Sequence, residues 1–338
     1  MKKVILSATF LLAGAVVFAQ TDNTSSVDQN GTQNNAVVNQ EGDNASTIVQ
    51  MGSVNANSGL LNDARVTQEG DDNTSNVAQD GDRNEAIVRQ NRATGNGDVE
   101  DNTARIIQGN NGNAERNYAR TLQSGDNNDS RQEQLWDNND AWVDQSGDDN
   151  VARQLQVAGP PNNSPGNDAR ITQSGDDNRG DQKQYGTRND ARITQSGEGN
   201  DAFQIQGGLG AGSIVDRNMA VAVQSGDDNY SLEDQSGDRN DSRVDQSGDD
   251  NQSRTYQMGD LNTSRVDQSG NDNRSRVTQT SDRNTSRVTQ SGDDNRSTVL
   301  QQGGILNDSR VTQLGGDDVS TVTQTGMGNT SRVTQDNL

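Results

Sequence analysis

An eleven-residue unit of the form N-x-[A/S]-x-[V/I]-x-Q-x-G-x-x repeats along the chain from Asn23 to Gln335. Its glutamine recurs 26 times, and an asparagine stands six residues before it in every unit except one, where Asp318 takes that place. Alanine or serine stands four residues before the glutamine in all units but one, where Gly180 replaces it. Self-similarity at a fixed period is the sequence signature of solenoid folds. The repeat therefore predicts a solenoid.

Within each unit the side chains alternate with a period of two. In the segment NTSRVTQ at residues 284–290, the Asn, Ser, Val and Gln share one face, and the two Thr and the Arg share the other. Alternation over seven residues is typical of a β-strand, whereas an amphipathic helix needs i, i+3, i+4 spacing. The Ser-Gly-Asp-Asp that follows at residues 291–294 has turn chemistry, because glycine adopts positive φ freely. Each unit therefore predicts one strand and one tight turn.

Two such units make one rung of a flattened coil. A seven-residue strand spans roughly 23 Å, and the turn after it reverses the chain. We therefore expect an all-β fold, a β-solenoid of about 13 two-stranded rungs built from the 26 strand-turn units, with cross-β stacking. At about 4.8 Å per rung the stack would be on the order of 60 Å long.

The valine position of the unit predicts how the strands divide between two sheets. Counted from Asn23, this position is polar in repeat strands 9, 11, 13, 15, 17 and 19 and apolar in the even-numbered strands between them. Such parity is explained if odd strands form one sheet and even strands the other. We therefore expect a polar inner stack on one sheet, formed by Gln132, Gln154, Gln182, Gln204, Glu233 and Thr255.

Interior amides are expected to hold the rungs together. Each rung buries only two Val-type and two Ala/Ser-type side chains, so the hydrophobic effect contributes little. An interior amide without partners costs about 1–3 kcal/mol, but stacked identical amides can bond to one another up and down a column. The predicted ladder residues are Asn34, Gln40, Asn73, Gln79, Asn229, Gln235, Asn240, Gln246, Asn251, Gln257, Asn262, Gln268, Asn273, Gln279, Asn284, Gln290, Asn295, Gln301, Asn329 and Gln335.

The first residues predict export from the cytoplasm. Lys2 and Lys3 precede an apolar run from Val4 to Phe18, and Ala19 ends a small-residue cleavage site, which is the layout of a secretory signal peptide. We assign 1–19 to the signal peptide and 20–338 to the repeat domain. No later apolar stretch reaches membrane length, so we expect a secreted or cell-surface protein without membrane insertion.

Composition narrows the possible functions. The chain has no Cys and no His, which removes thiolate chemistry, the usual zinc ligands and the usual general base. Its formal charge of −22 disfavours nucleic acid as a partner. Carboxylates recur periodically in turns, as a solvated surface requires, and not as a local catalytic cluster. We therefore predict no enzyme, no cofactor and no metal site.

Two other classes of protein stay open as alternatives. Gly-Asp-Asp-Asn turns are rich in oxygen ligands for calcium, although the nine-residue calcium repeat G-G-x-G-x-D-x-U-x is absent. A monomeric solenoid that binds ice or glycans is the second alternative. Arginine interrupts the outward threonine columns that an ice-binding face needs, whereas aromatic candidates for glycan contact exist in Trp136, Trp142, Tyr185 and Tyr256.

The repeat resembles the curlin repeat of curli fibre subunits, whose pattern is S-x5-Q-x4-N-x5-Q. Asn34 to Gln40, Asn73 to Gln79 and Asn273 to Gln279 match the N-x5-Q half, and the resemblance covers residues 23–335. Asparagine opens nearly every half here, where the family alternates Ser and Asn. The resemblance implies an amyloid-type β-solenoid of the biofilm matrix, with a nucleator subunit and an outer-membrane export pore as partners.

The repeats nearest the two ends predict self-assembly. The strands at residues 23–29 and 329–335 keep the full motif, so each is expected to expose an unpaired edge. Open head-to-tail contacts do not close and generate filaments. We therefore expect a structural subunit of extracellular curli-like fibres that serve adhesion and surface colonisation. A monomeric adhesin or ligand-binding protein and a minor nucleator of the same fibre are the alternatives.

Overall fold

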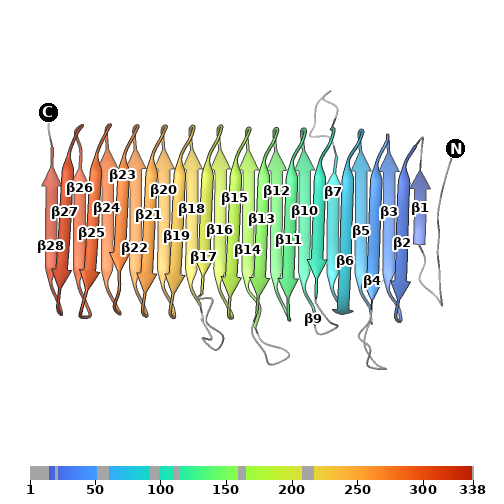
Figure 1. The fold of residues 1–338 in the computed structure, drawn as a ribbon, viewed down its shortest axis with the longest axis horizontal. Coiled ribbons are helices and arrows are strands. Elements are labelled where there is room, and N and C mark those ends of the chain that lie inside the picture. Colours follow the sequence, from blue (N-terminus) through green and yellow to red (C-terminus); the bar gives the residue numbers. More distant parts are fainter. Residues whose placement is uncertain are drawn as a thin grey trace. The chain divides into compact units, whose positions relative to one another are not determined.

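The computed structural model describes residues 15–19, 22–51, 61–91, 99–109, 114–158, 165–207 and 217–336, the side chains of 15–19 excepted. The chain divides into two compact units, Met1–Asp176 and Asp177–Leu338. All the regular elements in the described ranges are β-strands (Figure 1). No helix long and apolar enough to cross a membrane occurs in these ranges.

The first unit consists of short strands joined by tight turns and by longer connections. In chain order its strands are β1 (Ala15–Ala19), β2 (Thr24–Asn30), β3 (Asn35–Glu41), β4 (Ala45–Met51), β5 (Asp63–Glu69), β6 (Thr74–Asp82), β7 (Glu85–Gln90), β8 (Thr103–Gln108), β9 (Ala114–Glu115), β10 (Tyr118–Ser124), β11 (Asp129–Leu135), β12 (Asp140–Ser146), β13 (Val151–Val157) and β14 (Asp168–Ser174).

The second unit continues the same alternation of strand and turn. Its strands are β15 (Arg179–Tyr185), β16 (Asp190–Ser196), β17 (Asp201–Gln206), β18 (Met219–Ser225), β19 (Tyr230–Ser236), β20 (Asp241–Ser247), β21 (Gln252–Met258), β22 (Thr263–Ser269), β23 (Arg274–Gln279), β24 (Thr285–Ser291), β25 (Arg296–Gln302), β26 (Asp308–Gln313), β27 (Val319–Thr325) and β28 (Thr330–Gln335).

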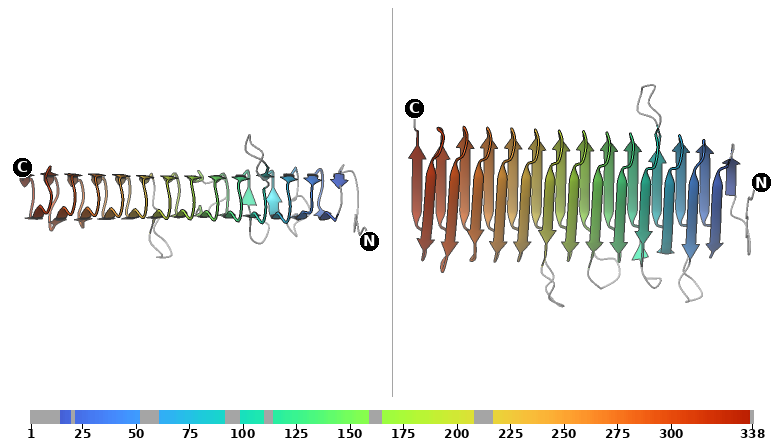
Figure 2. Two further views of the ribbon diagram at one scale, coloured as in Figure 1. Left: turned by 90° about the horizontal axis from the view of Figure 1, so that it is seen from above. Right: turned by 45° about the horizontal axis from the view of Figure 1, so that its top comes forward.

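Within each compact unit, the repeat strands pair in parallel with the next repeat strand but one. In the first unit the two sheets follow the orders β1-β3-β5-β7-β10-β12-β14 and β2-β4-β6-β8-β11-β13, and β9 pairs with β6 outside this path. In the second unit the orders are β16-β18-β20-β22-β24-β26-β28 and β15-β17-β19-β21-β23-β25-β27. Figure 2 shows the two layers of strands edge-on. The described ranges contain all 26 predicted repeat strands, so the predicted β-solenoid is confirmed.

Strand pairing keeps the repeats in register along each sheet. Gln246 pairs with Gln268, and Val244 pairs with Val266, in β20 and β22. Because side chains alternate across a strand, this register stacks identical residues on the same face. Valine and isoleucine side chains of the two sheets therefore meet in the interior, and in the second unit the valines form an apolar cluster. Burying each such side chain contributes about 1.5–3 kcal/mol.

Many of the turns hold two residues in left-handed conformations. In the turn after β18, Gly226 has φ of 96° and Asp228 has φ of 54°. In the second unit, the turns after β18, β20, β22 and β24 place aspartate at the second position, whereas the turns after β19 and β21 place Arg239 and Leu261 there. One side of the unit is therefore an acidic edge, which we define as Asp227, Asp228, Asp249, Asp250, Asp272, Asp293 and Asp294.

Substitution of a turn glycine tests the close approach of neighbouring turns. A Cβ on Gly226 would collide with the carbonyl oxygen of Gly248 in the next rung, whereas a Cβ on Gly328, with φ of 69°, meets nothing within 4 Å. We expect Gly226→Ala to lower the free energy of unfolding by about 3 kcal/mol or more. Gly328→Ala should lower it by only about 1 kcal/mol, the cost of left-handed alanine. Urea unfolding of the two variants measures the difference, and equal losses would contradict the packing of turns.

Candidate functional site

Within the two units, the repeat glutamines form columns in the interior in which one glutamine bonds to the glutamine of the next rung. Gln246 Nε2 donates to Gln268 Oε1 at 2.9 Å, and Gln268 Nε2 donates to Gln290 Oε1 at 2.9 Å. Gln268 Nε2 also donates to the backbone carbonyl of Gln252 on the opposite sheet, at 3.1 Å. One amide thus joins successive rungs and also ties the two sheets together.

The asparagine of the eleven-residue repeat holds the turns in place. Asn273 donates from both its backbone N and its Nδ2 to Asn251 Oδ1, at 3.2 and 3.0 Å, and its Nδ2 also donates to the carbonyl of Gly292 at 2.7 Å. The asparagine column therefore uses backbone groups as well as amides, which differs from the amide-to-amide column expected from the sequence. Its bonds to neighbouring asparagines point to the lower-numbered rung, whereas the glutamine bonds point to the higher-numbered rung.

Eighteen of the twenty ladder residues expected from the sequence are buried, and Asn329 and Gln335, at the last described rung, are half-buried. In the first unit, Gln40 donates to Gln68 and Gln79 donates to Gln108, each at 2.8 Å, in different sheets. The remaining pairs lie in the second unit, where each glutamine from 235 onward contacts a glutamine one rung away.

The polar inner stack lies on the sheet of the odd-numbered repeats. In the first unit Gln132 Nε2 donates to Gln154 Oε1 at 3.0 Å. In the second unit Gln182 donates to Gln204, and Gln204 donates to Glu233 Oε1, each at 2.9 Å. Thr255 pairs with Glu233 in the next strand, and its buried hydroxyl has no hydrogen-bond partner among the described residues.

One buried polar residue at the same position lies on the opposite sheet. Thr121 in β10 is fully buried, and its Oγ1 donates to Gln132 Oε1 at 3.1 Å and lies 3.0 Å from Ser130 Oγ. Thr121 is an exception to the expected parity, because it is a polar residue in an even-numbered repeat strand. It bonds across the interior to the polar stack of the other sheet. The polar signal was present in the sequence, where threonine stands two residues before Gln123.

Glu233 is a carboxyl group within a column of amides. It is fully buried, its Oε1 accepts from Gln204, and its Oε2 has no hydrogen-bond partner in the described part of the chain. Burial raises the pKa of Glu233 from 4.5 to about 8, and the nearby Ser242 hydroxyl and Gln204 amide favour the charged form by less. At neutral pH the carboxyl is therefore mostly protonated and uncharged, like the amides of its column.

The four aromatic candidates for glycan contact do not form one surface in either unit. Trp142 is half-buried, packs against Tyr118 with ring centroids 5.7 Å apart, and lies under Arg120 and Arg170. In the described ranges the ring pairs join Trp142 with Tyr118 and Phe203 with Tyr230, and none joins two of the four candidates. Trp136 lies in a turn with φ of 71°, Tyr185 ends β15, and Tyr256 lies under Arg276.

The acidic turns form their own ladder. Asp249 Oδ1 accepts the backbone N–H of Asp227 in the neighbouring rung at 3.0 Å, and Asn271 Oδ1 accepts that of Asp249 at 3.0 Å. No group of three or more Asp, Glu, His or Cys side chains placed to hold a metal ion occurs within the described ranges. In these turns the first carboxylate of each pair therefore serves backbone bonding between rungs.

Adjacent glutamines in β25 test the ladder directly. Gln301 accepts from Gln279 and donates to Gln324, whereas Gln302 is half-buried on the outward face. Gln301→Leu leaves one buried donor and one buried acceptor unpaired, so we expect the free energy of unfolding to fall by about 2–5 kcal/mol. Gln302→Leu is the matched control and should change it by about 0.5 kcal/mol or less. Urea unfolding midpoints measure both, and equal midpoints would refute the ladder as a stabilising element.

Glu233→Gln tests the protonated carboxyl. A pKa raised from 4.5 to about 8 in the folded state means that the folded chain binds more protons than the unfolded chain between these values. The contribution of Glu233 to stability should therefore be fully present below pH 4.5, be lost as the pH rises to about 8, and level off above it. A glutamine side chain cannot ionise, so the variant should lose most of this pH dependence and be the more stable protein at pH 8. The exposed Glu198→Gln is the control, and an unchanged pH profile in E233Q would exclude this explanation.

Comparison with known proteins agrees with the repeat geometry. The model of the curlin associated repeat family matches residues 62–91, 165–197 and 248–280. The first of these segments spans β5 to β7 and the last spans β21 to β23, so each contains consecutive strands with their ladder amides. A search of curated proteins finds no match. These three segments of the chain are therefore curlin associated repeats.

Proposed function

We propose that this protein is a secreted structural subunit that polymerises head to tail into extracellular curli-type amyloid fibres. The family suggests this role, and the amide ladders supply a physical basis for it. Every rung presents the donors and acceptors that the next rung requires, so a rung at an edge is a template for another chain.

The hydrogen-bonding groups of the two terminal rungs are the main support for this proposal. Near the amino-terminal end, Gln40 Oε1 and Asn34 Nδ2 are buried without hydrogen-bond partners among the described residues. At the other end, Gln335 Nε2 donates to the carbonyl of Val319 alone among the described residues, whereas the inner Gln301 Nε2 donates to three acceptors. One end thus lacks a glutamine donor and the other has one available.

The direction of the bonds makes the two ends complementary. Glutamine donates to the higher-numbered rung, so Gln335 Nε2 of one copy can donate to Gln40 Oε1 of the next copy. Asparagine donates to the lower-numbered rung, so Asn34 Nδ2 of that next copy can donate to Asn329 Oδ1. Both bonds form in the same head-to-tail arrangement. Such a contact uses different surfaces on each copy and does not close, which produces a filament.

Removal of the proposed signal peptide would expose the amino-terminal edge. β1 pairs in parallel with β3, with Ala19 opposite Gln40, and thereby covers the backbone edge of that strand. Cleavage after Ala19 would remove β1 and leave the β3 edge available to another copy. Export would therefore precede assembly, which fits a fibre built outside the cell, with a nucleator and an outer-membrane pore as the expected partners.

This function requires no catalysis. The interior of each unit is filled by ladder amides and small apolar side chains, and the family is a structural one. We therefore assign the protein a mechanical role in a biofilm matrix, in adhesion and surface colonisation. A monomeric extracellular adhesin would share the fold but would not use its strand edges.

A charge at the terminal rung tests the end contact. Val333 in β28 is only partly buried and packs against the apolar cluster of the second unit, so a lysine there can reach solvent in the monomer. Head-to-tail joining would bury that lysine without a partner, and we expect Val333→Lys to abolish fibre growth. Thr334→Lys, on the outward face of the same strand, is the matched control and should grow normally.

Thioflavin fluorescence, fibre diffraction and negative-stain microscopy of the mature chain measure these outcomes. A small fraction of V333K added to the unmodified protein should also stop growth, because the variant can add through its intact amino-terminal end and then block the next addition. Fibres of V333K at the normal rate, or an unmodified chain that stays monomeric at high concentration, would contradict the proposed function.

A further inference from the structure

Four arginines form a groove on the outward face of the second unit. Arg254, Arg274, Arg276 and Arg296 project from β21, β23 and β25 and are all exposed. With Ser275, Ser297, Thr298 and Gln252 they line a depression of about 310 Å³. Arg254 stacks beside Arg276, and Arg274 beside Arg296, in adjacent strands. We call this set the arginine groove.

Within the described residues, no carboxylate neutralises the arginine groove. None of its four guanidinium groups forms an ion pair within the described residues, and Asp272 and Asp294 in the preceding turns do not reach them. Arg254 and Arg276 lie instead over the rings of Tyr230 and Tyr256, at 5.4 and 5.6 Å from the centroids.

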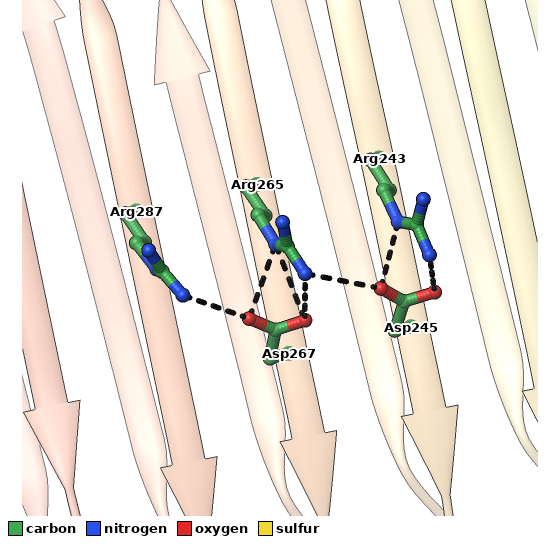
Figure 3. A network of polar contacts seen from close by, with 5 residues as sticks. All are labelled: Arg243, Asp245, Arg265, Asp267 and Arg287. Carbon is green, nitrogen blue, oxygen red and sulfur yellow. Dashed lines mark hydrogen bonds and ion pairs between the residues drawn. The ribbon is translucent and has the colours of Figure 1, made fainter.

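On the other sheet of the same unit, aspartates neutralise the outward arginines. There Arg243, Arg265 and Arg287 alternate with Asp245 and Asp267 in a continuous ion-pair ladder (Figure 3). The carboxylates stand two residues after the arginines in their strands. In the groove the corresponding positions are Tyr256 after Arg254, Thr278 after Arg276 and Leu300 after Thr298.

Unpaired arginines at this spacing are costly in isolation. Strands of one sheet lie about 4.8 Å apart, so like charges in one column repel. The chain has 50 Asp and Glu against 28 Lys and Arg, and nevertheless none of the described carboxylates pairs with the groove. A planar guanidinium pairs best with a carboxylate or another planar oxyanion, to which it can donate two hydrogen bonds.

We propose that the arginine groove binds the acidic edge of a second copy of this chain, side by side. Both surfaces are fixed to consecutive strands, so guanidinium and carboxylate groups repeat with the same spacing along the solenoid. Asp228, Asp250, Asp272 and Asp294 are exposed in four successive turns. A column of carboxylates can therefore face the groove over all three of its strands without loss of register.

This lateral contact is distinct from the end contact proposed above. It uses the outward face and a turn edge, whereas end-to-end growth uses the backbone edges of terminal strands. Side-by-side pairing is therefore measurable in the V333K background, where fibres are not expected. If V333K forms fibres after all, the width of fibre bundles reports the lateral contact separately.

The test compares two fourfold variants with the same change of net charge. The groove variant is R254Q/R274Q/R276Q/R296Q. The control is R65Q/R192Q/R243Q/R265Q, in which each arginine removed has a carboxylate partner within its own strand. We expect sedimentation at low salt to show that V333K associates with itself. The groove substitutions, added to V333K, should weaken this self-association at least tenfold. The control should change it by less than about twofold, and 0.5 M salt should weaken it in all three proteins.

The reciprocal variant separates the contact from general charge effects. D228N/D250N/D272N/D294N lowers the net negative charge, so nonspecific repulsion between copies decreases, and asparagine tolerates the left-handed conformation. Loss of association in this variant therefore supports the proposal. Association equal to that of V333K in either the groove or the edge variant would overturn it. Binding of dextran sulfate by the groove without any effect of these variants on self-association would also overturn it.

Discussion

The hydrogen-bonding requirement of buried amides governs this fold. Only 26% of the residues are apolar, and the interior contains an asparagine and a glutamine for nearly every strand. Such an interior is stable only where each amide finds its partners, and parallel strands in register provide them at every rung. The Gln268 amide illustrates this arrangement, since its single nitrogen donates both to the next rung and to the opposite sheet. Glycine turns, strand length and repeat period all follow from keeping those amides aligned.

The same requirement separates positions that are restricted in residue type from positions that are free to vary. Most inward polar positions hold residues that continue a column, and burial keeps the carboxyl group of Glu233 protonated at neutral pH. Outward positions have no such constraint, so the two sheets of the second unit differ strongly in charge. One has the alternating ladder of Arg243, Asp245 and their neighbours, and the other has arginines that form no ion pair with any described residue. Surface chemistry can therefore diversify on a scaffold whose interior stays uniform.

Much of the fold follows from the sequence because period and parity are one-dimensional signals. Strand type, the pairing of alternate repeats and the inward position of residues such as Gln268 all derive from them. Features that depend on neighbouring rungs do not. The asparagine bond to a backbone N–H, the left-handed Asp228 and the bond of Thr121 to the opposite sheet each depend on a neighbouring rung or on the facing sheet. The arginine groove likewise exists because of what the adjacent strands lack.

The opposite orientation of the two amide columns gives the solenoid a chemical direction. Glutamine side chains donate toward one end and asparagine groups toward the other, rung after rung. The amide dipoles add along each column, so a filament made of such subunits would be polar, with two chemically different ends. An arriving subunit would meet open glutamine donors at one tip and open glutamine acceptors at the other. The kinetic consequence of this asymmetry is that the two ends of the filament grow at unequal rates.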